Sequence, residues 1–221
     1  MITFDSQFKV GVPFMPARLP DAEVKGEPMF FNSSLGFAYQ RGGPITREFL
    51  TAFRRSLGPE VDLRDCVFDS RVHMLMKGWF PCIPGFHHDD VPRGDNGQPN
   101  YRYPAYRAKH VLGLVNGHIC PTEFAVGRVE VSDPEQHPLV YKAWHVEVEE
   151  AVRQGTLRSV DAPSGRLVHF DSDAFHQGVR AVADGWRWFG RISWDTERVT
   201  HITDETRAQV QVYMENPFEG W

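Results

Sequence analysis

Long apolar runs are missing from this 221-residue sequence. No stretch approaches the roughly 18 uncharged apolar residues that a membrane-spanning helix needs. The opening residues MITFDSQFKVGVPF also lack the basic start and apolar segment of a secretion signal. We therefore expect a soluble, cytoplasmic protein.

Cysteine is scarce, and no pair of cysteines has the spacing of a zinc or redox motif. The three residues, Cys66, Cys82 and Cys120, are odd in number and form no CxxC sequence. We expect them to be small buried hydrophobic residues in a reducing compartment.

Positive charge is not in excess, because 29 aspartates and glutamates outnumber 24 lysines and arginines. The formal net charge of -5 gives no general field that would attract nucleic acid or an anionic membrane. We therefore expect no membrane partner and do not favour a nucleic-acid partner. The sequence specifies no oligomeric state.

The residues that are present favour a single β-rich domain spanning residues 1–221. A hydrophobic content of 41% suffices for one sizeable core, and the 19 glycines and 16 prolines are spread along the chain, as in a turn-rich β protein. Short or alternating apolar runs predict strands, and apolar residues at helical spacing predict helices. The predicted strands are residues 72–80, 110–115, 157–160, 166–170 and 186–194, and the predicted helices are residues 46–57 and 146–153. This pattern indicates a mostly β fold with flanking helices, a double-stranded β-helix or jelly roll of the cupin type.

The sharpest local motif is PGFHHDD at residues 84–90, directly after a predicted strand. Residues i and i+2 of an extended segment point to the same side, so an H-x-D tripeptide brings an imidazole and a carboxylate to one point. Two histidines and one carboxylate commonly hold Fe(II) in oxygenases. His87 with Asp89 is the preferred frame because the PGF sequence ends the strand at His87, and His88 with Asp90 is the alternative.

A third ligand is needed, and His176 is the best candidate. It stands in the sequence FDSDAFHQG, residues 170–178, after one predicted strand and before the last. His169 is the nearest competitor, but it lies within a predicted strand, where a histidine is ordinarily structural. The sequence therefore predicts a metal site formed by His87, Asp89 and His176.

Two arginines follow His176 on a predicted strand. Arg187 lies eleven residues after His176, and Arg191 lies four residues further on. Along a strand both share one face with Phe189. A guanidinium group grips a carboxylate with two hydrogen bonds and stays charged at physiological pH. Either arginine could anchor a dicarboxylate that chelates iron with its other end, and Arg187 is the first choice.

The order of His87, Asp89, His176 and Arg187 resembles the pattern of the 2-oxoglutarate/Fe(II) dioxygenase superfamily, which is H-x-D, a distal histidine and an arginine shortly after it. The resemblance spans roughly residues 70–195. It implies that Fe(II), 2-oxoglutarate and O2 are the cofactors and that Arg187 holds the C5 carboxylate of 2-oxoglutarate. It also implies that a substrate C–H bond is hydroxylated, with release of succinate and CO2.

The segment Thr122-Glu123-Phe124 is similar to the T-E-F stretch of taurine and chlorophenoxyacetate dioxygenases. By that similarity Thr122 also contacts 2-oxoglutarate. The large insert of those enzymes is absent between Thr122 and His176, so in compactness the chain resembles phytanoyl-CoA dioxygenase-like proteins more closely. The substrates of neither group are transferred to this chain.

The substrate is expected to be a small molecule that is recognised by loops. Residues 91–107 lose all periodicity and are rich in Pro, Gly and Asn, as in a binding or lid loop. Tyr103 and Arg107 of this loop, together with Arg191, are the predicted substrate-binding residues.

Two other functions fit the same residues. A nucleic-acid base oxidase of the same superfamily would stack a flipped base on the tyrosines of residues 91–107, although the acidic balance of the chain disfavours it. A cupin-like protein that binds Zn(II) or Mn(II) without 2-oxoglutarate would use the same three ligands, because these do not specify the metal. Arg187 distinguishes the readings, since only a 2-oxoglutarate enzyme needs it.

Overall fold

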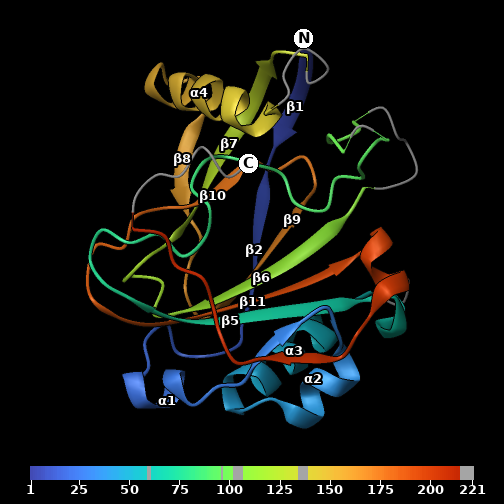
Figure 1. The fold of residues 1–221 in the computed structure, drawn as a ribbon, viewed down its shortest axis with the longest axis vertical. Coiled ribbons are helices and arrows are strands. Elements are labelled where there is room, and N and C mark those ends of the chain that lie inside the picture. Colours follow the sequence, from blue (N-terminus) through green and yellow to red (C-terminus); the bar gives the residue numbers. More distant parts are fainter. Residues whose placement is uncertain (59–60, 96, 102–106, 134–138, 215–221) are drawn as a thin grey trace.

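Antiparallel β structure dominates the computed structural model, which describes residues 1–58, 61–95, 97–101, 107–133 and 139–214 (Figure 1). The larger sheet has the spatial order β2 (Phe8–Pro13), β9 (Arg166–Asp171), β6 (Lys109–Val115), β11 (Gly185–Trp194), β5 (Val67–Leu75) and β4 (Ser33–Ser34). The smaller sheet contains β1 (Ile2–Ser6), β7 (Thr122–Val131) and β10 (His176–Gly178), with β8 (Arg158–Asp161) paired to β7. A separate ribbon pairs β3 (Met29–Phe31) with β12 (Glu205–Arg207).

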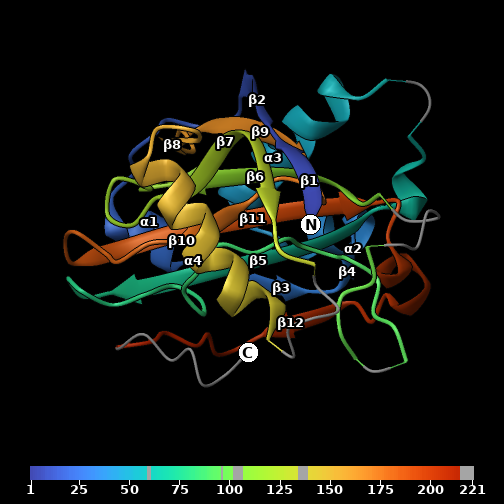
Figure 2. The same ribbon diagram turned by 90° about the horizontal axis from the view of Figure 1, so that it is seen from above.

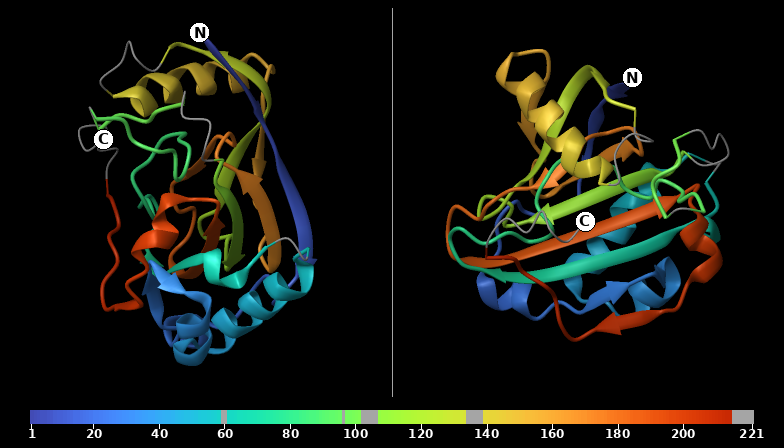
Figure 3. Two further views of the ribbon diagram at one scale, coloured as in Figure 1. Left: turned by 90° about the vertical axis from the view of Figure 1, so that its right-hand side faces the viewer. Right: turned by 45° about the horizontal axis from the view of Figure 1, so that its top comes forward.

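The first two strands tie the two sheets together. β1 pairs with β7 in the smaller sheet, and β2, which begins after a single intervening residue, pairs with β9 in the larger one. Figure 3 shows this segment running almost straight from one sheet to the other. The two sheets are therefore two walls of one fold, and the predicted double-stranded β-helix with flanking helices is confirmed.

Helices cover the outer sides of the fold. Three of them, α1 (Asp21–Lys25), α2 (Leu35–Arg41) and α3 (Pro44–Ser56), lie on the side of the larger sheet, and α4 (Val140–Arg153) lies at the opposite end against β7 (Figures 1 and 2). Two short 3-10 turns, η1 (Leu63–Asp65) and η3 (Glu197–His201), complete the list of helical elements among the described residues.

The helix α3 is amphipathic, and its apolar face packs on the larger sheet. Pro44 begins it, in the first turn, where its missing N–H costs no hydrogen bond. Phe49 is fully buried against Phe68 and Trp188, with ring centroids 6.0 Å and 5.4 Å away. A Cβ atom at Gly113 would lie 2.7 Å from the Phe49 ring, so a glycine there permits this close approach.

The helix α4 packs through an aromatic cluster on the smaller sheet. Trp144 is fully buried, and its ring lies 5.4 Å from Phe4 of β1 and 5.9 Å from Phe175, which precedes β10. This aromatic cluster packs next to β10, the strand that carries His176.

The predicted elements are found with changed boundaries. The strand predicted over residues 72–80 was wrong in its second half, because β5 begins at Val67, ends at Leu75 and is followed by a turn at Gly78. Gly78 has a φ of +93°, a conformation that terminates a strand. The helix predicted over residues 146–153 begins earlier, at Val140. The strand β7 was not predicted.

Within the described residues, no helix combines the length and the apolar character needed to cross a membrane.

Candidate functional site

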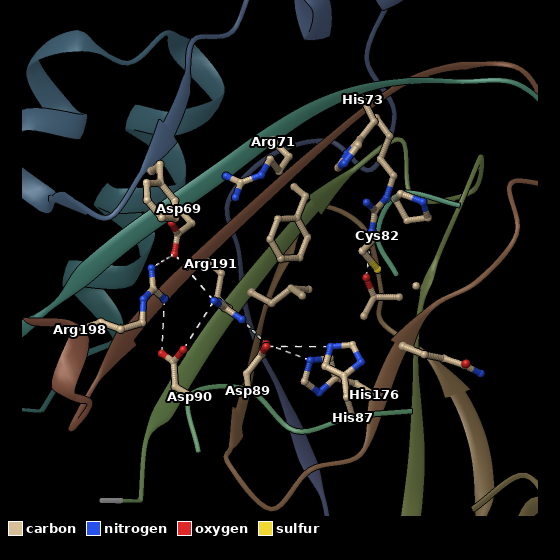
Figure 4. A pocket seen from close by; sticks show the side chains of 18 residues that line it. Asp69, Arg71, His73, Cys82, His87, Asp89, Asp90, His176, Arg191 and Arg198 are labelled. Atoms are coloured by element: carbon tan, nitrogen blue, oxygen red, sulfur yellow. Dashed lines mark hydrogen bonds and ion pairs between the residues drawn. The ribbon is translucent and has the colours of Figure 1, made fainter. Parts of the chain in front are cut away.

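A cavity of about 400 Å³ lies between the two sheets. One wall consists of alternate residues of β5 and β11, and the other consists of Thr122 at the start of β7 and residues 176–178 of β10. The segment of residues 81–90 closes one side and carries the H-x-D motif (Figure 4). All the residues predicted to bind metal or 2-oxoglutarate line this one cavity.

The structure brings His87, Asp89 and His176 together. One potential ligand atom from each lies within 4.8 Å of the others. His176 Nε2 is 3.0 Å from Asp89 Oδ2, and His87 Nε2 is 4.0 Å from Asp89 Oδ1. A reciprocal pair of backbone hydrogen bonds sets this geometry, because the N–H of each histidine donates to the carbonyl of the other, at 3.1 Å and 3.2 Å.

Each of the two imidazoles is held in one orientation by a backbone carbonyl. His87 Nδ1–H donates to the Gly85 carbonyl at 2.8 Å, and His176 Nδ1–H donates to the Ala174 carbonyl at 2.9 Å. The Nε2 atoms are then the acceptor nitrogens, and both face the Asp89 carboxylate (Figure 4). Two nitrogen lone pairs and a carboxylate that point at one place form a donor set for a cation.

The charge states also suit a cation. Burial, with a smaller contribution from the neighbouring His176, lowers the pKa of His87 to about 4, so the His87 ring is neutral at physiological pH. Burial alone would raise the pKa of Asp89, but the Arg191 guanidinium and His176 outweigh it and hold this pKa well below its usual value. Asp89 is therefore an anion and His87 a neutral donor, as metal binding requires.

The alternative frame, His88 with Asp90, does not converge on one point, because Asp90 lines the cavity and His88 does not. His88 is buried among aromatic rings, with its centroid 3.9 Å from Phe175 and its Nδ1 3.0 Å from the Tyr101 hydroxyl. Asp90 accepts a hydrogen bond from Arg198 at 3.4 Å. His169, the other candidate for the third ligand, lies on β9 and does not line the cavity.

Arg187 is buried at the other end of the cavity, with only 2% of its surface exposed. Its Nη2 donates to the hydroxyl oxygen of Thr122 at 2.9 Å, so the two residues predicted to bind 2-oxoglutarate contact each other across the two sheets. Its Nε atom has no hydrogen-bond partner, and no carboxylate among the described residues pairs with it. Burial lowers the pKa of Arg187.

His73 also lines the cavity, and the sequence motifs did not single it out. It faces the cavity from β5, directly opposite Arg187 in the strand register. It is buried, and neither ring nitrogen has a hydrogen-bond partner among the described residues. Burial, with a further contribution from Arg187, holds its pKa well below 6.5, so the ring is neutral. The sequence does contain a pattern that could have identified His73, because Asp69, Arg71 and His73 alternate and place polar side chains on one face of a strand.

Arg191 differs from Arg187 because acidic side chains surround it. It forms an ion pair with Asp89, and its Nη2 is 3.8 Å from Asp69 and 3.9 Å from Asp90. Arg198 of η3 completes the network by pairing with Asp69 and, at 3.4 Å, with Asp90. The sequence left the choice of the main anchor between the two arginines open. Of Arg187 and Arg191, only Arg187 has no acidic partner among the described residues.

Of the two other predicted substrate-binding residues, the structure describes only Arg107, which does not line the cavity. Tyr103 lies outside the described residues. Arg107 is exposed and pairs with Asp173 at 2.7 Å, away from the cavity lining. Their role in substrate binding stays a prediction.

The sequence matches no protein-family model and no curated protein. Similar solved structures include HygX from Streptomyces hygroscopicus with nickel and 2-oxoglutarate bound, which is 12% identical, with 87% of this chain and 83% of that chain covered and a TM-score of 0.43. The nickel complex of the non-heme monooxygenase ThoJ is 15% identical, with 87% and 74% covered and a TM-score of 0.42. EvdMO1 is 14% identical at a TM-score of 0.32, and the match covers 57% of this chain but only 26% of EvdMO1. Because these TM-scores are low, any conclusion on function rests on the geometry of the site itself.

Proposed function

We propose that this protein is an Fe(II)- and 2-oxoglutarate-dependent dioxygenase that hydroxylates a small organic molecule. His87, Asp89 and His176 hold the metal, and Arg187 with Thr122 binds the C5 carboxylate of 2-oxoglutarate. When bound, the iron and 2-oxoglutarate together activate O2, and the hydroxylation of a C–H bond is accompanied by release of succinate and CO2.

The donor set fits the metal. Two imidazole nitrogens and one carboxylate converge on one point, and the residues described on the cavity side of them supply no fourth protein ligand. A site with three protein ligands leaves positions open for a chelating co-substrate and O2, which is typical of non-haem iron oxygenases.

The single observation that carries the proposal is the buried Arg187 without an acidic partner. Removing a guanidinium ion from water without a counter-ion costs several kcal/mol. Such a residue is retained where a ligand supplies the negative charge. Arg187 Nε and the two nitrogens of His73 are buried polar atoms that form no hydrogen bond with the described residues, and all belong to residues that line the cavity. A carboxylate bound there would provide acceptors for them.

The other residues of the site orient the ligands. The carbonyls of Gly85 and Ala174 fix the rotation of the two imidazoles, and the Arg191 guanidinium holds the Asp89 carboxylate. A set of ligands fixed in this way changes little when the metal binds. The cavity volume of about 400 Å³ suits a small-molecule substrate.

The test is the weak visible absorption band of an Fe(II) ion chelated by a 2-oxo acid, recorded without oxygen after adding Fe(II) and 2-oxoglutarate. We expect the band in the wild type, none in His176→Ala, and metal binding without the band in Arg187→Ala. His169→Ala is the matched control, because this histidine lies outside the cavity, and it should show the wild-type band.

A wild type that gives no band but binds Zn(II) or Mn(II) tightly would contradict the proposal. The cupin-like metal-binding alternative would then account for the three ligands.

A further inference from the structure

A second cavity of about 560 Å³ adjoins the site, and the two share Arg71, Pro81, Cys82 and His87 in their walls. The remaining walls of the second cavity come from Ile83 and from residues of the C-terminal segment between Arg207 and Tyr213. A molecule in the second cavity therefore lies next to His87, which is one of the proposed metal ligands.

Two arginines meet at this junction around one aromatic ring. The guanidinium carbon of Arg71 lies 6.0 Å from the centroid of the Phe31 ring, and that of Arg207 lies 3.8 Å from it. Arg71 donates from Nη1 to the carbonyls of Phe30 and Ser70, at 3.1 Å and 2.8 Å. Neither Arg71 nor Arg207 has a carboxylate partner among the described residues.

Both arginines are positively charged at neutral pH. Burial lowers the pKa of Arg71 to about 10, which leaves the group protonated; Asp69 opposes this lowering and Arg207 adds to it. Two like charges held against one ring repel each other, and an anion between them would replace this repulsion with attraction.

The charged side chains that line the site carry one more positive charge than negative charges. Its lining contains four arginines and three aspartates. All three aspartates interact with Arg191 or Arg198. A divalent metal and the two carboxylates of 2-oxoglutarate cancel each other, so the excess of one positive charge remains when both are bound. Arg71 forms no ion pair with a carboxylate among the described residues, although Asp69 attracts it, and Arg207 contacts the same Phe31 ring.

We propose that the substrate is a small organic oxyanion, a carboxylate, sulfonate or phosphate, whose charged group binds between Arg71 and Arg207 with its apolar part directed past Phe31 to the metal ligands. The assignment of this anion as the substrate rests on the proposed function, whereas the anion site itself does not.

The spacing along β5 keeps the two anions apart. Arg71 and His73 are two residues apart on the same face of the strand, which is roughly 7 Å. His73 faces Arg187, and Arg71 faces Phe189 in the register. The co-substrate carboxylate and the substrate oxyanion would thus bind side by side without sharing an arginine.

The test compares 4-fluorobenzoate with 4-fluorobenzamide, which differ in charge and hardly in shape. Their binding to protein loaded with Ni(II) and 2-oxoglutarate is followed by fluorine NMR. We expect the benzoate to bind about tenfold more tightly than the benzamide, and about tenfold more weakly to Arg71→Met and to Arg207→Met than to the wild type. Arg55→Met, an exposed arginine at the end of α3, is the control and should bind like the wild type.

Equal binding of the two probes by the wild type would overturn the proposal, as would unchanged benzoate binding in Arg207→Met. Arg71 also supports two backbone carbonyls, so Arg207→Met decides the matter if Arg71→Met does not fold. With 4-fluorophenyl phosphate as a third probe, the preferred kind of oxyanion is identified.

The failure of this proposal is distinguishable from failure of the proposed function. If the wild type gives no Fe(II) and 2-oxoglutarate band, benzoate binding is measured in Arg187→Met. This substitution removes the other cavity arginine that has no acidic partner among the described residues. Binding that still depends on Arg207 would establish the anion site in a protein of another function. If the wild type gives the band and benzoate binding is unchanged in Arg71→Met and Arg207→Met, the dioxygenase proposal is supported and the anion-site proposal is overturned.

Discussion

At the scale of single residues, counter-ions separate the arginines of the site into two kinds. Arg191 and Arg198 are neutralised by three aspartates, whereas Arg187 and Arg71 are not. Fixed ion pairs hold the structure of the site, and a charge without a partner is available to a ligand. The same distinction applies to histidines, because His87 and His176 are held by carbonyls, while the ring nitrogens of His73 form no hydrogen bond in the part of the chain that the structure describes.

We predict that His73 contributes a hydrogen bond to 2-oxoglutarate. His73→Phe should weaken 2-oxoglutarate binding by roughly 10- to 100-fold, because a hydrogen bond to a charged group contributes roughly 1.5 to 3 kcal/mol. Anaerobic titration of the visible band with 2-oxoglutarate gives the affinity, and the affinity for Fe(II) alone should not change. His73→Gln keeps an N–H donor and should recover part of the loss. An unchanged 2-oxoglutarate affinity in His73→Phe would show that this histidine only fills space.

At the scale of elements, β5 and β11 act as a matched pair. Cavity-facing residues alternate along both strands, and the register places Arg187 opposite His73, Phe189 opposite Arg71, and Arg191 opposite Asp69. A slip of one residue would turn both sets out of the cavity. The pairing continues over nine residues on β5, which fixes the register firmly.

The helix α4 has the corresponding role for the smaller sheet, and a prediction follows for Trp144. Its ring is fully buried, and its Nε1–H donates to the Ser132 carbonyl at 2.8 Å. Trp144→Ala should lower the free energy of unfolding by roughly 3 to 5 kcal/mol, because it leaves a cavity between α4 and the sheet. Urea unfolding of the metal-free protein measures this.

Val146→Ala is the control on the same helix. Val146 is 62% exposed, so its truncation should change the free energy of unfolding by less than about 0.5 kcal/mol. Similar losses in the two variants would mean that α4 is not anchored through its buried face.

At the scale of the whole molecule, the site exists only where the two sheets meet. His176 and Thr122 come from the smaller sheet, Arg187 and His73 come from the larger one, and His87 comes from the segment between β5 and β6. Ligands that contact all three parts bind the folded protein and not the unfolded chain. Binding must therefore stabilise the fold.

We predict that Ni(II) and 2-oxoglutarate raise the melting temperature in two separable steps. At a concentration of 100 times its dissociation constant, each ligand should add roughly 2.7 kcal/mol, which for a domain of this size corresponds to roughly 5 to 10 °C. Thermal unfolding followed by circular dichroism measures both steps. Arg187→Ala should keep the step caused by Ni(II) and lose the step caused by 2-oxoglutarate. An equal second step in Arg187→Ala would place the 2-oxoglutarate elsewhere.

The sequence by itself predicted strands and residues of the candidate site. The period-two pattern indicated strands, and the H-x-D tripeptide, the distal histidine and the arginine eleven residues later named His87, Asp89, His176 and Arg187. These signals are local, since each depends on residues close together in the chain or on the direction of side chains along a strand. The tertiary structure then brought these residues to one cavity.

Only the tertiary structure decided which arginine lacks a counter-ion, that His73 belongs to the site, and that His88 does not. The reason is that the deciding partners are remote in sequence. Arg191 is neutralised by Asp69 and Asp89, more than a hundred residues earlier in the chain, and Arg187 meets Thr122 from the other sheet. Desolvation and charge compensation depend on everything that surrounds a group, and the folded chain alone specifies those surroundings.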